Sequence, residues 1–422
     1  MNIYLMIMSF DIYGGLVYWG CLFPPHGTWV RLLLCYFSIE GINMKKTLVC
    51  SGVAAVLALF TMPAYSAALL IAKATEVAPK SGWAGYDAGT TGGSKATSAN
   101  IYQVRNKQQL VDAIKNGGNS AKIIQVIGTL DISEGAPYRS VADQKSRSQI
   151  PLTANTTLIG TDKNAKIVNG SLVISKVNNV IIRNLYLETP VDVAPKFESG
   201  DGWNAEWDSL TISESEHVWV DHVTFSDGSF TDDQYGKKDG WKYVQHDGML
   251  DIKKGSDYIT ISHSHFNQHD KTMLIGHSDS NKSQDAGKLR VTLHNNLFED
   301  VTQRVPRVRF GRVHAYNNLY LGDITRPVYP YLYSFGIGKE GGVLSEKNYF
   351  SVNGAIDGCE LVKSFTGTLF KDSGSVLNNA GMTLSGKCSF SSALPQPPYS
   401  YNSVEPGKLP NLVKANAGVG KI

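Results

Sequence analysis

The chain has little cysteine, little net charge and, beyond its first 67 residues, no long apolar run. Only Cys359 and Cys388, two of the five cysteines, follow residue 68, which excludes a disulfide-rich scaffold for the body of the chain. Two cysteines are enough for one disulfide that closes a local loop. The formal net charge of +3 over 422 residues gives no electrostatic reason to expect nucleic-acid binding.

The one long apolar stretch stands near the amino terminus. Met44-Lys45-Lys46 precedes an apolar run at 48–62, and the small residues Ala64, Ser66, Ala67 and Ala68 follow. This run is too short to span a membrane, and its pattern is typical of a secretory signal peptide. We therefore predict a secreted protein with no membrane span. Its parts would be a signal peptide at 44–67 and a single domain at 68–422, after an upstream extension or start-site artefact at 1–43. An unusual amino-terminal anchor is the alternative for residues 1–43.

The body of the chain is rich in β and turn formers, and it repeats. The sequence holds 41 Gly and 20 Tyr, and its one convincing amphipathic helix covers 107–116. Five eight-residue segments, which start 22 to 41 residues apart, each end in an apolar or aromatic residue. Their fifth residue is always polar: Asn184, His222, His263, Asn295 and Asn317.

A short β-rich run stands before three of these segments, at 172–175, 210–213 and 250–253. Repeated short strands that share one phase are typical of a solenoid in which each strand pairs with its equivalents in the neighbouring coils. We therefore predict an all-β fold, a right-handed parallel β-helix with long loops on one side that form the binding groove. A β-sandwich is the rival, but its turns would come every 8–12 residues without a repeated phase.

Acidic residues lead into two corresponding strands of this predicted solenoid. Glu206 and Asp208 precede one strand, and Asp247 and Asp251 lie at the next, where Asp247 follows Asp208 by 39 residues (247 − 208). Stacking would bring the two pairs to neighbouring positions about 4.8 Å apart. Carboxylates that lie so close must be protonated or neutralised by a cation, and a set of oxygen ligands suits Ca²⁺.

Cationic residues follow one coil later. Lys271 ends a His-Asp-Lys run, and Arg304, Arg307 and Arg309 surround Pro306. Because proline favours an extended chain, we expect Arg307 and Arg309 on one face and Arg304 set apart. Calcium beside such cations along an open groove indicates a receptor for a polyanion, and repeated sugar carboxylates fit an elongated groove. The indicated chemistry is proton abstraction next to a carboxylate, followed by loss of a leaving group.

These motifs resemble the extracellular pectate lyases of plant-pathogenic and soil bacteria, polysaccharide lyase family 1. The resemblance rests on 201–208, 218–222, 243–253, 269–271 and the Arg-x-Pro-x-x-Arg run at 304–309. It implies a parallel β-helix that cleaves polygalacturonate (de-esterified pectin) by calcium-dependent β-elimination. The products would be oligosaccharides with unsaturated 4,5-galacturonate ends.

The resemblance also implies roles for single residues. Arg304 would remove the proton at C5, and Lys271 and Arg309 would hold substrate carboxylates. Because guanidine ordinarily stays protonated, this role predicts activity that rises toward alkaline pH. The implied calcium ligands are Asp208, Asp247 and Asp251, with Glu206 as an additional acidic residue. A structural role, rather than direct chemistry, is expected for Trp219, Asp221 and His222.

Two other functions fit the same residues. A polygalacturonase, which is a glycoside hydrolase, would use two of Asp208, Asp247 and Asp251 as acid and base. A non-catalytic polyuronide-binding β-helix would have no use for an intact Arg304 and Lys271. In each case we expect a monomer whose partner is the polygalacturonate polymer.

Overall fold

The computed structural model describes residues 11–12, 15–21, 35–39, 70–354, 357–384 and 387–422. The chain divides into two units, Met1–Leu70 and Ile71–Ile422, each of which is described by itself. In the first, β1 (Asp11–Ile12), β2 (Gly15–Cys21) and β3 (Cys35–Ile39) form an antiparallel sheet. The apolar run at 48–62 lies outside the described residues, so the signal peptide stays a prediction.

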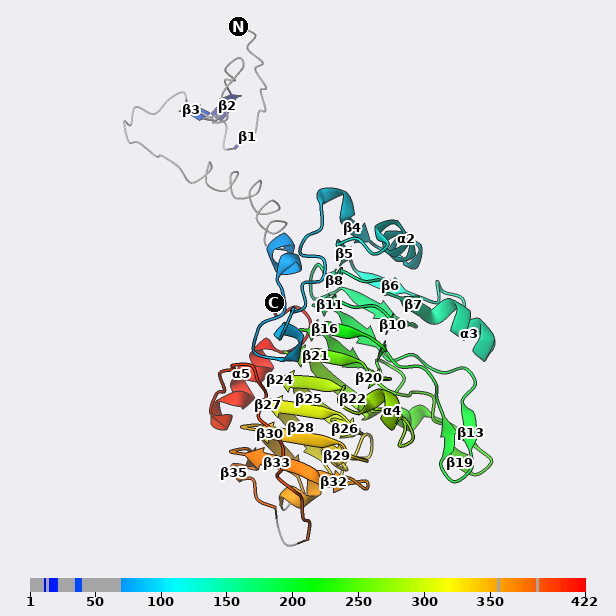
Figure 1. The fold of residues 1–422 in the computed structure, drawn as a ribbon. Coiled ribbons are helices and arrows are strands. Elements are labelled where there is room, and N and C mark those ends of the chain that lie inside the picture. The colour runs from blue at the N-terminus through cyan, green and yellow to red at the C-terminus, as the bar shows by residue number, and fades with distance from the viewer. Residues whose placement is uncertain (1–10, 13–14, 22–34, 40–69, 355–356, 385–386) are drawn as a thin grey trace. The chain divides into compact units, whose positions relative to one another are not determined.

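The second unit is built from three parallel sheets that run along a solenoid (Figure 1). Sheet 1 contains β7 (Gln149–Pro151), β10 (Ser171–Ser175), β15 (Leu210–Ser213), β20 (Leu250–Lys253), β23 (Met273–Ile275), β26 (Arg307–Val308), β29 (Phe335–Ile337) and β32 (Val362–Ser364). Sheet 2 contains β4 (Ile101–Val104), β5 (Lys122–Val126), β8 (Thr156–Gly160), β11 (Val180–Arg183), β16 (Glu216–Asp221), β21 (Asp257–Ser262), β24 (Arg290–His294), β27 (Arg312–Tyr316), β30 (Gly342–Glu346) and β33 (Leu369–Ser373). Sheet 3 contains β6 (Thr129–Asp131), β9 (Lys166–Val168), β12 (Tyr186–Glu188), β17 (Thr224–Ser226), β22 (His265–Lys271), β25 (Leu297–Gln303), β28 (Leu319–Asp323), β31 (Tyr349–Asn353), β34 (Val376–Leu377) and the antiparallel β35 (Ala380–Gly381). The predicted right-handed parallel β-helix is confirmed.

The sequence suggested that each of the five repeated segments is a single strand, but each contributes to two strands. Each one ends a strand of sheet 2, bends at its fifth residue and begins a strand of sheet 3. The five polar residues at the bend all have positive φ, between 44° and 56°. Asn and His tolerate this left-handed region better than β-branched residues do, which explains why the position is polar.

The eighth residue of each segment builds the core. Four of them, Phe225, Phe266, Phe298 and Tyr320, stack along the solenoid together with Phe350 of the next coil, with centroids 4.4 to 5.0 Å apart. A second stack lies beside the bend. There the backbone N–H of Asn296 donates to Asn318 Oδ1 at 3.0 Å, and that of Asn318 donates to Asn348 Oδ1 at 2.8 Å. In-register pairing thus turns one repeated residue into a continuous column.

A helix covers the amino-terminal end of the solenoid, and other helices lie along its sides (Figure 1). The predicted helix at 107–116 is α2 (Lys107–Gly117), capped by the Asn106 side chain, which accepts from Gln109 N–H at 2.9 Å. Near the carboxyl terminus, Leu409 and Val413 pack against Leu297 and Leu319 of sheet 3. The α-helices are α2, α3 (Val141–Ser148), α4 (Lys282–Asp285), α5 (Leu409–Asn416) and a turn of helix at 70–75. The 3₁₀ helices are η1 (Trp83–Gly85), η2 (Ser98–Asn100), η3 (Asp232–Gln234), η4 (Gly358–Glu360) and η5 (Pro406–Lys408). None of the described helices is long and apolar enough to cross a membrane.

Two hairpins project from the loops that lead into sheet 1, one between β12 and β15 and the other between β17 and β20 (Figure 1). They are β13 (Lys196–Glu198) with β14 (Gly202–Asn204), and β18 (Lys237–Lys238) with β19 (Trp241–Lys242). Near the other end, Cys359 and Cys388 form the disulfide that the sequence suggested.

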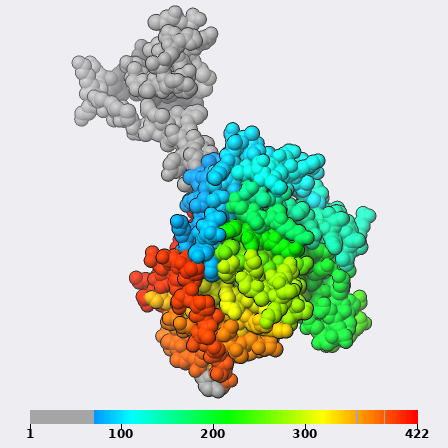
Figure 2. All heavy atoms as spheres, in the orientation of Figure 1, coloured from blue at the N-terminus to red at the C-terminus, as the bar shows by residue number. Residues whose placement is uncertain are grey.

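The segments at both ends of the second unit cover sheet 2. Figure 2 shows the chain after residue 70 in blue and the carboxyl-terminal segment in red, side by side over the coils. Ala78 and Ala84 pack against Ile181 and Trp219, and Gly418 N–H donates to the backbone oxygen of His263 at 2.7 Å. Sheet 2 is therefore a buried structural face, whereas sheet 1 is free to carry a groove.

Lys122, on β5, is a fully buried lysine with a testable effect on stability. Its Nζ donates to Ala154 O at 2.8 Å and to Thr156 Oγ1 at 2.9 Å, and burial lowers its pKa from 10.5 to about 8. Between these pH values the unfolded chain binds more protons than the folded chain, so stability rises with pH. We expect the unfolding free energy of the native protein, relative to Lys122→Met, to rise by on the order of 2 kcal/mol between pH 8 and 10. Denaturant titrations at both pH values measure it, and a constant difference would contradict it.

Candidate active site

An outward-facing row of residues crosses sheet 1. The parallel register pairs Thr211 with Asp251, Asp251 with Leu274, Leu274 with Arg307, and Arg307 with Gly336. The flanking residues of these strands point into the core, because side chains alternate along a strand. A groove of about 280 Å³ lies over the middle of this row, at Leu274 and Arg307. It is lined by Glu198, Asp201, Asn204, Ala205, Asp247, Lys271, Leu274, His277, Arg304, Arg307 and Arg309.

Gly248 lies between two of the predicted calcium ligands. Its N–H donates to Asp208 Oδ1 at 3.1 Å, and a Cβ atom at this position would lie 2.8 Å from both Asp208 Oδ1 and Asp251 Oδ1. The second oxygen of Asp208 accepts from Thr211 Oγ1 at 2.6 Å and lies 3.4 Å from Lys253 Nζ. The missing side chain at position 248 thus leaves room for two carboxylates on adjacent coils.

The electrostatics of this cluster favour a bound cation. Burial, and then Asp208, raise the pKa of Asp247 to about 6, and the same two causes raise the pKa of Asp251 well above its ordinary value. Burial disfavours the Lys253 ammonium, but Asp208 and Asp251 outweigh burial and raise its pKa. A single lysine faces three carboxylates, and their oxygen atoms suit Ca²⁺. These residues therefore fit the metal that the sequence indicated.

The fourth predicted acidic residue, Glu206, has a cationic partner. Glu206 Oε2 lies 2.8 Å from Lys196 Nζ on the β13 hairpin, and both side chains are exposed. Its backbone N–H donates to Asp192 Oδ2 at 2.9 Å. The structure therefore pairs Glu206 with a lysine, and its role as a calcium ligand stays a prediction.

The predicted cations gather in the groove. Lys271 and Arg304 both act on the Asp247 carboxylate and lower its pKa, against the effects of burial and Asp208. Lys271 Nζ donates to Asn204 Oδ1 at 2.5 Å. Arg304 has a φ of 58°, and its buried Nε has no hydrogen-bond partner among the described residues. A left-handed backbone at a bulky residue is costly, and such strain often occurs at functional sites.

The three arginines of the 304–309 run line the same groove, Arg304 directly after β25 and Arg307 in β26. Their partners differ. Arg309 Nε donates to Asp279 Oδ1 at 2.6 Å, and Arg309 Nη1 donates to Gly276 O at 3.0 Å. Arg307, which had no predicted role, forms no such ion pair in the described chain, and its guanidinium lies 4.1 Å from the centre of the Phe365 ring.

Two features of the site were missed from the sequence. Lys253 could have been predicted, because it follows Asp251 by two residues and so faces the same way. His269 could not, because its partner Asp227 is 42 residues away. The Nδ1 of His269 lies 2.7 Å from Asp227 Oδ1, and its Nε2 lies 2.7 Å from Asp247 O. Both partners only accept, so both ring nitrogens donate. Burial disfavours this imidazolium, but Asp227 outweighs burial and raises its pKa, and the ring thereby fixes the Asp247 backbone.

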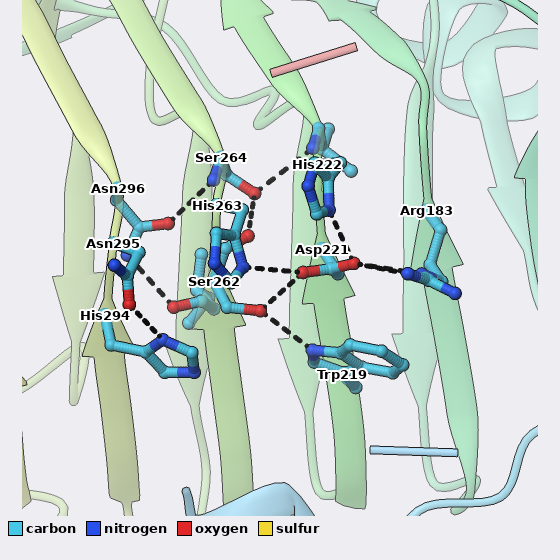
Figure 3. Close-up of polar contacts among 12 residues, drawn as sticks. Arg183, Trp219, Asp221, His222, Ser262, His263, Ser264, His294, Asn295 and Asn296 are labelled. Atoms are coloured by element: carbon cyan, nitrogen blue, oxygen red, sulfur yellow. Dashed lines mark hydrogen bonds and ion pairs between the residues drawn. The ribbon is translucent and has the colours of Figure 1, made fainter. Parts of the chain in front are cut away.

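The Trp219-Val220-Asp221-His222 motif lies on sheet 2, outside this groove (Figure 3). Asp221 is buried, and its Oδ2 accepts from Arg183 Nε at 3.0 Å and lies 2.7 Å from His222 Nδ1. The Arg183 guanidinium also lies 4.6 Å from the Trp219 ring. The motif therefore joins adjacent coils through a buried ion pair.

The other carboxylate oxygen of Asp221 also has polar partners on the next coil. Asp221 Oδ1 accepts from Ser262 Oγ at 2.6 Å and lies 3.3 Å from His263 Nδ1 (Figure 3). Asp221, His222 and His263 are the one group among the described residues whose possible metal ligands all lie within 4.8 Å of one another. Asp208, Asp247 and Asp251 are therefore spread more widely. However, a guanidinium already neutralises Asp221, which makes this group a poor cation site.

Comparison with known proteins agrees with the site and the fold. A family model described as pectate lyase matches residues 45–422. Pectate lyase D of Dickeya chrysanthemi is 57% identical over 363 residues, which cover 84% of this chain and 92% of that protein. A pectate lyase of Bacillus subtilis (strain 168) is 37% identical over 389 residues, which cover 81% of this chain and 92% of that protein. A solved structure of a pectate lyase bound to hexasaccharide is 34% identical, with a TM-score of 0.77, and covers 82% of this chain and 99% of that chain. The chain therefore belongs to the pectate lyase family and is a pectate lyase.

Proposed function

We propose that this enzyme cleaves polygalacturonate, de-esterified (1,4)-α-D-galacturonan, by calcium-dependent β-elimination, and that its products carry unsaturated 4,5-galacturonate ends. The observation that carries the proposal is one groove in which Lys271 and Arg304 act on a buried, electrostatically strained Asp247. A polymer with a carboxylate on every residue matches such a row of cations. Family membership argues against both the hydrolase and the non-catalytic alternative.

Asp208, Asp247 and Asp251 would hold the calcium ion. Their mutual repulsion and burial disfavour three free carboxylates, which supports this assignment. Bound calcium supplies positive charge that neutralises a substrate carboxylate and so acidifies the C–H bond next to it. Lys253, 3.4 Å from Asp208, partly balances the cluster without the ion.

The cations of the groove would have different roles in the reaction. Arg304 takes the proton from C5, the C5–H electron pair becomes the C4=C5 double bond, and the C4–O bond breaks. The leaving sugar oxygen takes a proton from solvent. Lys271 and Arg309 hold substrate carboxylates and orient the sugar. The position of Arg304 in the lining of the groove, beside Lys271 and Asp247, supports its role.

Calcium should control both turnover and stability. We expect ultraviolet absorbance from unsaturated ends to grow on polygalacturonate with calcium, to stop in excess EDTA and to return when calcium is restored. Highly methylated pectin should be cleaved more slowly, because its esters cannot pair with cations. We also expect calcium to raise the unfolding temperature of the native protein but not that of Asp251→Asn, which lacks one ligand charge.

Several outcomes would contradict this. Full activity in EDTA would exclude the metal role. Reducing ends that form without ultraviolet absorbance would indicate hydrolysis. Binding of the polymer without any product would indicate a non-catalytic protein. An unfolding temperature that responds equally in native protein and Asp251→Asn would move the metal to another site.

Secretion and a monomeric state are further parts of the proposal. The disulfide between Cys359 and Cys388 supports secretion, because disulfides persist in oxidising compartments. Sequencing the amino terminus of protein recovered from the growth medium tests it, and a terminus upstream of residue 44 would contradict cleavage at 44–67.

A further inference from the structure

The loop between β28 and β29 places a buried tyrosine at the end of β17. Tyr329 is 1% exposed, and its O–H donates to Asp227 Oδ2 at 2.7 Å. Sheet 3 orders these strands as β28, β25, β22 and β17, so the loop reaches back over two intervening strands to make this contact. The same hydroxyl oxygen accepts from the backbone N–H of Asp232 at 3.0 Å. One hydroxyl group therefore joins segments that lie 102 residues apart in the chain.

The backbone of Tyr329 is held in an unfavourable conformation. Its φ is 52°, in the left-handed region, which is costly for a bulky residue. Two backbone hydrogen bonds fix the residues that follow: Tyr331 N–H donates to Asp323 O at 3.0 Å, and Leu332 N–H donates to Thr302 O at 2.8 Å. Strain of this kind persists only where the surrounding structure fixes it, and it is frequent near functional sites.

Asp227 contacts His269 with its other oxygen. The distance from Asp227 Oδ1 to His269 Nδ1 is 2.7 Å, and both side chains are 1% exposed. The two oxygens of one carboxylate thus have two different partners, Tyr329 and His269. Because a carboxylate is planar, the hydrogen bond at one oxygen fixes the direction in which the other oxygen faces. Loss of the Tyr329 O–H would leave Oδ2 buried without a donor, which favours rotation of the carboxylate away from His269.

His269 in turn holds the peptide unit between Asp247 and Gly248. Its Nε2 donates to Asp247 O at 2.7 Å, and Gly248 N–H donates to Asp208 Oδ1 at 3.1 Å. This C=O and this N–H belong to one planar peptide unit, so a tilt of the plane at one side also moves the other. A series of hydrogen bonds therefore runs from Tyr329 to two of the three proposed calcium ligands.

We propose that Tyr329 is a positioning residue of the calcium site, whose hydroxyl orients Asp227 and His269 and thereby the peptide unit between Asp208 and Asp247. The inference rests on the calcium dependence in the proposed function. Tyr329 is not among the residues that line the groove, so it acts through other residues and takes no part in proton transfer. It therefore sets the affinity for calcium, whereas turnover by the calcium-saturated enzyme does not depend on it.

The test compares Tyr329→Phe with Tyr331→Phe. Tyr331 lies in the same loop and is also buried, but its hydroxyl lies 2.8 Å from Ser334 Oγ instead of contacting Asp227. Each variant loses one buried hydroxyl, so Tyr331→Phe controls for a general loss of stability. We expect Tyr329→Phe to raise the calcium Kd, measured by calorimetry, roughly tenfold, the lower end of the range for outer partners of a metal site. Tyr331→Phe should keep the native Kd, and both variants should keep the native kcat at saturating calcium.

A double mutant shows whether the hydroxyl acts through His269. In His269→Gln the ring that joins Asp227 to the Asp247 backbone is absent, so the further change Tyr329→Phe should not raise the calcium Kd again. An additional tenfold rise in that background would overturn the route through His269.

The calorimetric measurement separates this proposal from the proposed function. If the native protein binds calcium, equal Kd values for Tyr329→Phe and Tyr331→Phe would overturn the role of Tyr329 alone. If the expected Kd values are found but polygalacturonate yields no unsaturated product, the proposed function fails and the role of Tyr329 stands. A native protein that binds no calcium would refute both.

Discussion

Replacement of Arg304 by lysine is expected to lower kcat roughly a thousandfold, the scale of a lost general base, while calcium binding and the unfolding temperature stay native. Lysine keeps the positive charge, so the electrostatics of the groove change little. However, its ammonium cannot reproduce the position of the guanidinium nitrogens, and Arg304 is held by a backbone with a φ of 58°. Initial rates on polygalacturonate at several pH values, together with calcium titration, measure the effect.

Arg312→Lys is the matched control. Arg312 begins β27 on sheet 2, and its Nη1 donates to the backbone oxygens of Phe310, Gly311 and Glu340. It lies outside the groove, so its variant should keep near-native kcat. Substantial turnover by Arg304→Lys would refute its assignment as the base. A parallel loss in Arg312→Lys would attribute the effect to arginine loss in general.

Replacement of Asp221 by alanine should destabilise the protein by about 3–5 kcal/mol without changing the chemistry of the folded enzyme. The change leaves Arg183 buried without its main partner, and it removes the acceptor of both His222 and Ser262. Denaturant unfolding measures the loss, and kcat/KM at low temperature shows whether the remaining folded enzyme is intact.

A second variant separates charge from packing. In Arg183→Met/Asp221→Leu both charges are removed, so it should recover part of the stability that Asp221→Ala loses. Native stability with lost turnover in Asp221→Ala would instead assign the motif to chemistry. That outcome would contradict the structural role expected for Trp219, Asp221 and His222.

The sequence allowed correct predictions where a residue's place follows from the repeat alone. The strands at 172–175, 210–213 and 250–253, the helix at 107–116 and the proximity of Asp208 to Asp251 all follow from phase and spacing. The bend after β16 could not be predicted in this way, because a polar fifth residue does not by itself indicate a left-handed φ. An eight-residue run of good strand formers therefore looked like one strand when it was two.

Contacts made by insertions could not be predicted in this way. Glu206 matches an acidic position by spacing alone, but Lys196 reaches it from a hairpin whose direction no repeat encodes. The contact from His269 to the Asp247 backbone likewise depends on Asp227 in another coil. Arg307 was left without a role because its partner, Phe365, lies two coils further on.

In-register pairing on sheet 1 has a consequence for how this enzyme can change. A one-residue insertion in β20 or β26 would turn the outward row into the core, so such changes should be eliminated by selection. A whole added coil keeps every residue on its face and separates Asp251 from Arg307 by one further step of about 4.8 Å. The spacing between metal ligands and arginines can therefore change only in discrete steps. Gradual variation in substrate preference must then come from side-chain length and from the loops between strands.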